Sequence, residues 1–275
     1  MARIGMIKTP LGMGFTIPGW NLDNLERSRL DKQLVLERSF GLMLSGRIIG
    51  DPDMKTDGLE MGHERQGKGF GYDVGIFNLP GRSGAVRDKS GSLGRGDSLS
   101  YIFRLHYDNT DMFHFEVAYG TVEAPESVTF EDVGVSDYDV FDIGVNSFIG
   151  DWNLKFEYIN GTNIRFQEDR EQDAMVFTVG RMISPQTEAV VKHYQGSFED
   201  SFGNEADLGN TYVGFNFFVE PLKFSHRKLQ NHRIQVFYVM ATGDDDVDDP
   251  AGWFNQDTLG GYVEDAWMTQ YQWKW

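Results

Sequence analysis

The chain has 275 residues, a formal net charge of −17 at pH 7 and no cysteine, so disulfide bonds and thiolate metal sites are excluded. No run approaches the ~18 consecutive apolar residues that a transmembrane helix needs. Aromatic residues make up 14% of the chain and 32 residues are glycine, a composition typical of many strands joined by turns.

Residues 2–8 are predicted to form the first strand, and they contain neither the apolar stretch nor the cleavage site of a signal peptide. The link that follows, 9–39, shows no alternation; it contains Pro10, Gly12 and Pro18 and then a balanced run of acids and bases. Because a link this long is usually functional or disordered, we expect it to fold inward and narrow a pore. An ordinary surface loop with a short amphipathic helix is the alternative.

Alternation of apolar and polar residues with a period of two, the pattern of half-buried strands, dominates the rest of the chain. In 100–107, for example, Phe103 and Leu105 alternate with Arg104 and His106. Together with 2–8, the pattern predicts twelve strands: 40–49, 70–79, 100–107, 113–120, 138–149, 152–159, 174–183, 188–198, 211–219, 233–241 and 266–275.

The predicted links alternate in length. Tight turns with suitable turn residues lie at 108–111, 150–151 and 184–187. Longer links lie between them, at 80–97, 121–137, 160–172, 199–209 and 242–265, and two links, 50–69 and 219–231, are longer than the rule allows. Short turns on one side and long links on the other are typical of an outer-membrane β-barrel.

The last strand indicates the same architecture, because Tyr271, Trp273 and Trp275 share one face and polar residues occupy the other. An aromatic lipid face and a polar lumen face are typical of barrel strands. We interpret these three aromatic residues as the membrane-assembly strand, similar to the element that the barrel-assembly machinery recognises. An edge strand of a soluble sandwich is the alternative.

We therefore predict an all-β fold: a transmembrane antiparallel β-barrel of about twelve strands, forming a single domain over 1–275 in the bacterial outer membrane.

Three segments, 123–137, 199–208 and 242–265, together hold 17 acidic residues and no Lys or Arg. If Trp275 ends in the periplasm, all three are external. We interpret them as solvated loops near outer-membrane lipid and lipopolysaccharide.

Three pieces of sequence resemble the phosphate-selective porin O and P family of Gram-negative outer membranes. Residues 3–12 are similar to the family's strand running into F-K-x-P-F-G, and 72–78 are similar to its Y-x-x-G-V-F-N. Residues 25–28, followed by 40–46, are similar to M-E-R and then I-G-V-M-L-S-G.

The resemblance implies a sixteen-stranded, homotrimeric porin with a basic channel. Because only about twelve strands are predicted here, we expect the chain to be the C-terminal three quarters of such a barrel. A genuine twelve-stranded barrel is the alternative.

An anion channel needs fixed positive charge along a water-filled path, and arginine suits phosphate because its planar fork matches oxyanion geometry. Alternation, or position in the inward-folding link, makes seven bases candidates for the pore and its constriction: Arg27, Arg29, Lys32, Arg38, Arg47, Arg104 and Lys155. Four acidic residues face the lumen by the same rule: Asp73, Glu116, Asp142 and Glu157. A structural salt bridge is the alternative role of any single base.

The six histidines predict no metal site, although His106 and His114 are expected to be neighbours across a hairpin, both facing the lumen. We expect no cofactor and no catalytic residue. The Ser225-His226 pair would suit a barrel phospholipase only if both side chains shared a face, and adjacent strand residues point to opposite faces.

We therefore predict a porin, not an enzyme, that passes small ions and solutes and prefers inorganic anions such as phosphate. We expect no nucleic-acid partner. A non-selective or cation-tolerant barrel and a soluble β-rich binding protein are the alternatives.

Overall fold

A computed structural model describes residues 1–17, 22–23, 25, 34–35, 38–50, 68–78, 98–109, 113–126, 128–130, 132–219, 232–242 and 264–273. Twelve strands form one sheet in the order of the sequence, each antiparallel to the next. They are β1 (Ala2–Lys8), β2 (Arg38–Gly50), β3 (Lys68–Asn78), β4 (Leu99–Asn109), β5 (Phe113–Val122), β6 (Tyr138–Ile149), β7 (Trp152–Thr162), β8 (Glu171–Ser184), β9 (Thr187–Glu199), β10 (Glu205–Phe218), β11 (His232–Ala241) and β12 (Ala266–Trp273).

The two faces of the sheet differ in chemistry because successive side chains of a strand point to opposite faces. In β4, Tyr101, Phe103 and Leu105 are exposed, whereas Arg104 and His106 are buried. The outer face therefore presents apolar side chains and the inner face holds buried polar groups. This inversion of a soluble protein's pattern is what a strand between lipid and lumen requires.

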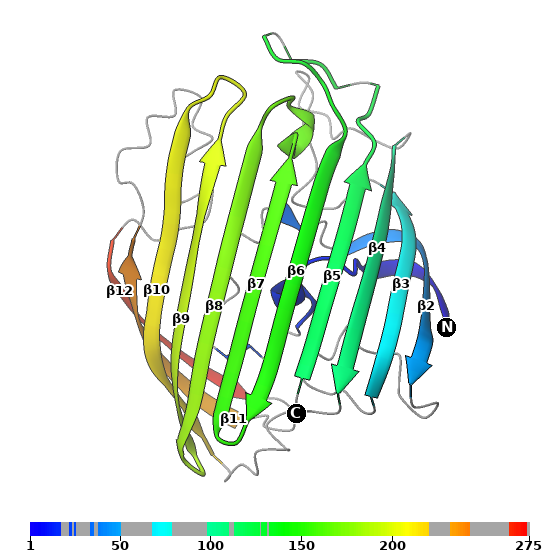
Figure 1. Ribbon diagram of the computed structural model, residues 1–275. Helices are drawn as coiled ribbons and strands as arrows, with labels where there is room; N and C mark the ends of the chain where they lie inside the picture. The colour runs from blue at the N-terminus through cyan, green and yellow to red at the C-terminus, as the bar shows by residue number, and fades with distance from the viewer. Residues whose placement is uncertain are drawn as a thin grey trace.

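The short and long links lie at opposite ends of the sheet (Figure 1). The turns after β6 and β8 are at one end, and the links after β5, β7 and β9 are at the other. The link after β7 contains a 3-10 turn, η2 (Ile164–Phe166). The predicted alternation of link lengths is confirmed for these described links.

The link after β9 is shorter than predicted, because β10 begins at Glu205 and pairs with β9 from there on. Asp200 closes the remaining turn: its carboxylate accepts hydrogen bonds from the backbone N–H of Phe202 at 2.8 Å and from the backbone N–H of Asn204 at 2.9 Å. Partial burial raises the pKa of Asp200, but the bonds from Asn204 and Phe202 outweigh it and lower the pKa below its ordinary value.

Part of the link between β1 and β2 folds into the concave side of the sheet, as predicted (Figure 1). We call its described residues, 9–17, 22–23, 25 and 34–35, the inner segment. It includes a short helix, α1 (Met13–Thr16). Leu11, Met13, Leu34 and Val35 are at most 2% exposed, and Leu11, Leu34 and Val35 belong to one hydrophobic cluster with buried apolar residues of the wall, such as Met43 and Phe77. Among the described residues, no helix has the length and apolarity needed to cross a membrane.

The sheet is open. Strand β1 pairs with β2 and β12 pairs with β11, and no pairing joins β1 to β12 within the described ranges. The two end strands therefore each carry one edge whose partner is not among the described strands.

Candidate functional site

The inner segment is anchored to the wall by buried carboxylates that accept backbone hydrogen bonds. The Gly12 N–H donates to Asp142 Oδ2 at 3.2 Å, and the Gly14 N–H donates to Glu157 Oε2 at 2.9 Å. Both carboxylates are buried, on β6 and β7 respectively. Because buried backbone N–H groups need hydrogen-bond partners, these two acids fix the path of the segment.

Asp23 connects the inner segment to strands β7 and β10. Its carboxylate forms an ion pair with Lys155 and accepts a hydrogen bond from Asn153 Nδ2 at 3.0 Å, both on β7. Its backbone carbonyl accepts a hydrogen bond at 2.7 Å from Nδ2 of Asn216, on β10. The candidate pore base Lys155 is thus held in an ion pair across the lumen side, the structural role that the sequence left open.

Arg104 is buried at 3% exposure between two carboxylates on neighbouring strands. Its Nε and one terminal nitrogen donate to Asp73 Oδ2 at 2.9 and 2.6 Å, and the other terminal nitrogen donates to Glu116 Oε2 at 3.2 Å. Ser45 donates to the second Asp73 oxygen at 2.5 Å. The fork geometry of arginine therefore joins β3, β4 and β5 on the inner face, and the Ser45 hydroxyl connects β2 to them through Asp73.

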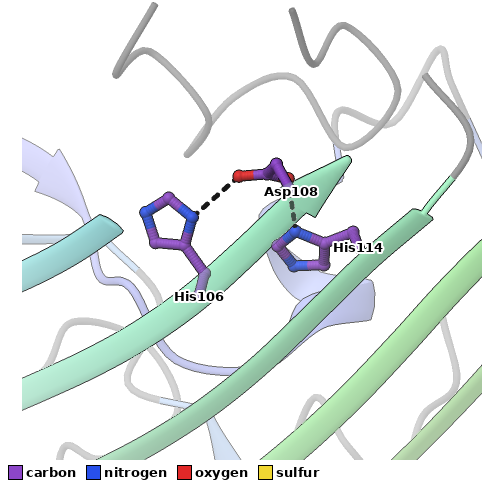
Figure 2. Close-up of side chains that lie close together, drawn as sticks. All are labelled: His106, Asp108 and His114. Carbon is purple, nitrogen blue, oxygen red and sulfur yellow. Dashed lines mark hydrogen bonds and ion pairs between the residues drawn. The ribbon is translucent and has the colours of Figure 1, made fainter. Parts of the chain in front are cut away.

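A second polar cluster continues from this one toward the β4–β5 turn (Figure 2). Asp108 lies between two imidazoles: its Oδ2 is 2.8 Å from His106 Nδ1 and its Oδ1 is 2.8 Å from His114 Nδ1. The other ring nitrogen of His114, Nε2, is 2.6 Å from Glu116 Oε2. The register explains the cluster, because Asp108 pairs with His114 and His106 pairs with Glu116 across the hairpin.

The sequence placed His106 and His114 near each other but missed Asp108. The signal was available: His106 and Asp108 are two residues apart, which puts them on one face of a strand. The β4–β5 register then places His114 opposite Asp108.

The remaining predicted site residues lie at several places. Arg38 is exposed at the start of β2 and Arg47 is half-buried beside a bulge in the β2–β3 pairing. Tyr271 and Trp273 are exposed, at 57% and 53%, on the outer side of β12. Four residues lie outside the described part of the chain: Arg27, Arg29, Lys32 and Trp275.

Among the described residues, buried acidic side chains outnumber buried basic ones. Seven carboxylates are buried: Asp23, Asp73, Asp108, Glu116, Asp142, Glu157 and Glu188. Five Lys or Arg residues are buried: Lys8, Arg104, Arg170, Lys192 and Arg233. The described inner wall is thus at least as acidic as it is basic.

Comparisons with known proteins agree on architecture. No protein-family model matches the chain, and no curated protein matches it in sequence. Among solved structures, OmpT, an outer-membrane protein of Vibrio cholerae folded in vitro, superposes with a TM-score of 0.56 at 10% identity, covering 99% of this chain and 76% of that one. A porin refined at 1.8 Å resolution gives a TM-score of 0.42 at 11% identity, covering 84% of this chain and 62% of that one. The superposition on OmpT shows that the chain has the fold of outer-membrane β-barrel proteins.

Proposed function

We propose that this chain forms an outer-membrane porin that lets small ions and solutes diffuse passively, with no catalytic step. One observation carries the proposal: a segment near the N-terminus lies against the polar inner face of a sheet whose outer face is apolar. A segment folded into the lumen narrows a channel without closing the wall around it. Such a device has a use in a pore and no evident use in a purely structural barrel.

We further propose that selectivity is weak and tolerant of cations, the alternative that the sequence left open. Arg104 and Lys155, two of the bases on which phosphate preference depended, are held by carboxylates. A base whose charge is cancelled by a buried partner contributes little field to a passing anion. Among the candidate bases, Arg27, Arg29 and Lys32 lie outside the described residues, and any phosphate preference would depend on them.

Planar-bilayer recordings on the detergent-folded full chain test both statements. We expect discrete conductance steps, and a reversal potential in a tenfold KCl gradient that lies near zero or on the cation side. Chain denatured by heat before addition is the control. Absence of steps from folded protein would contradict the porin, whereas steps with a strongly anionic reversal potential would contradict only the proposed selectivity.

If the recordings show anion preference, the variant Arg27→Ala/Arg29→Ala/Lys32→Ala decides whether the three bases carry it. A matched variant, Arg38→Ala, removes an exposed base at the start of β2. If the triple variant had the same chloride permeability and the same phosphate permeability as the native chain, these bases would be excluded as the selectivity site.

We also propose a homotrimer, insertion by the barrel-assembly machinery, and contact of the long links with lipopolysaccharide.

A further inference from the structure

The residues His106, Asp108 and His114 stand together on the inner wall with their potential ligand atoms within 4.8 Å of one another. All three are buried. Figure 2 shows both imidazole rings turned toward the Asp108 carboxylate from either side. From this geometry we propose that the β4–β5 hairpin binds one divalent transition-metal ion of the zinc class through His106 Nδ1, His114 Nδ1 and an Asp108 oxygen.

The donor set matches that class of ion. Two imidazole nitrogens and one carboxylate oxygen are ligands that zinc takes in four-coordinate sites, with the fourth position left to water. Calcium needs six to eight oxygen ligands and magnesium a nearly octahedral oxygen shell, which this hairpin does not provide among its described residues. Donors around a tetrahedral zinc are about 3.4 Å apart, so an ion would lengthen the two 2.8 Å contacts of Asp108 while all the donor atoms already lie within 4.8 Å of one another.

A carboxylate within hydrogen-bond distance holds the His114 ring in the ligating orientation, whereas the carboxylate behind His106 lies farther away. Glu116 Oε2 lies 2.6 Å from His114 Nε2, and Asp73 Oδ2 lies 4.0 Å from His106 Nε2. A metal-bound histidine usually donates its other N–H to a carboxylate, which fixes the ring and the tautomer. Here both rings direct Nδ1 toward Asp108 and Nε2 toward a carboxylate.

The contacts of His114 are compatible with a metal ion at Nδ1. A neutral imidazole carries one N–H, yet both nitrogens of His114 lie within 2.8 Å of carboxylate oxygens. A metal ion at Nδ1 removes the need for a second hydrogen on the ring and leaves Nε2–H to donate to Glu116.

The local charge also favours a divalent ion. Among the described residues of the two clusters, Asp73, Asp108 and Glu116 are acidic and Arg104 is basic, and all four residues are at most 4% exposed. With neutral imidazoles these four side chains sum to a formal charge of about −2, and binding to a metal ion stabilises buried carboxylates. One divalent ion cancels that charge.

Zinc binding by the folded full chain tests the proposal independently of conductance. After EDTA treatment and dialysis, the protein is titrated with ZnCl2 by calorimetry and bound metal is counted by mass spectrometry; CoCl2 supplies a visible absorption spectrum that reports ligand geometry. We expect one ion per chain, at least 100-fold weaker binding in His114→Gln and Asp108→Asn, and 10- to 100-fold weaker binding in Glu116→Gln.

The matched control is His193→Gln, which changes a histidine on β9 whose Nδ1 is 2.8 Å from the Thr211 hydroxyl. It should bind zinc as the native chain does. The heat-dependent gel mobility of a folded barrel confirms that each variant is folded before titration. If the folded native chain binds no zinc, or if His114→Gln and Asp108→Asn bind as well as His193→Gln, the hairpin is not a metal site and the cluster holds protons instead.

Discussion

Arg104 holds two carboxylates that come from different strands and that water does not reach. Removing the guanidinium leaves Asp73 and Glu116 buried with their main positive partner gone, at 1% exposure each. Breaking a buried ion pair in this way costs about 3–5 kcal/mol, far more than the net value of the intact pair, because an uncompensated charge stays in a medium of low dielectric. The same residue that suggested an anion path in the sequence is thus a structural tie.

We expect Arg104→Gln to lower the free energy of unfolding by about 3–5 kcal/mol, measured by urea titration of tryptophan fluorescence in detergent with EDTA present. The comparison variant is Arg181→Gln, whose exposed guanidinium lies 4.9 Å from the Trp152 ring centre. An exposed cation–π contact is worth about 0.5–1 kcal/mol. Equal stabilities of the two variants would mean that Arg104 does not compensate the buried acids.

At the scale of elements, the fit between β6 and the inner segment depends on a glycine. A Cβ added to Gly144 would lie 2.8 Å from Met13 Cβ and 2.9 Å from its sulfur. Met13 Cβ is attached directly to the backbone of α1, so it cannot move unless the helix moves. The absence of a side chain at Gly144 therefore allows the inner segment to reach the wall at that point.

We expect Gly144→Ala to lift the inner segment from the wall. Since the chain has no cysteine, Thr16→Cys, which replaces a side chain that is 3% exposed, gives a single reporter, and its maleimide labelling should become at least tenfold faster when Gly144→Ala is added. Gly161→Ala is the matched control, because its Cβ would meet the terminal Leu34 Cδ2 at 2.7 Å, which can rotate away. Equal labelling rates in the Gly144→Ala and Gly161→Ala backgrounds would show that the position of the inner segment does not depend on Gly144.

Period-two alternation was enough to predict the strands, because each one separates a lipid-facing from a lumen-facing row of side chains. It failed at the start of β10, where Asp207 and Gly209 interrupt the apolar row although the backbone still pairs with β9. The alternation also predicted that Arg104 and Lys155 point inward, but it did not predict which residues they contact. Asp73 reaches Arg104 through the β3–β4 register, and Asp23 reaches Lys155 through the path of a link that has no periodicity.

At the scale of the whole molecule, the unpaired edges of β1 and β12 are unfavourable in a lipid bilayer. An edge strand exposes unpaired N–H and C=O groups, and hydrocarbon offers them no partner, so membrane sheets close on themselves. Twelve is an even number, so β1 and β12 run in opposite directions and are able to form an antiparallel pair. Their outward side chains are also alike in character: Ile4 and Trp267 are 79% and 75% exposed.

We expect β1 and β12 to pair when the chain is folded in lipid. The test combines Ile4→Cys in turn with Trp267→Cys, Thr269→Cys or Tyr271→Cys, so that both cysteines lie on the outer face. We expect one combination to form an intramolecular disulfide. It would be seen as a monomer with altered gel mobility that reduction reverses. Ile4→Cys with Val191→Cys, on β9 far along the sheet, should give none. Cross-linked dimers in place of monomers would show that the edges pair between copies, and the absence of any cross-link would show that β1 and β12 do not pair in this chain.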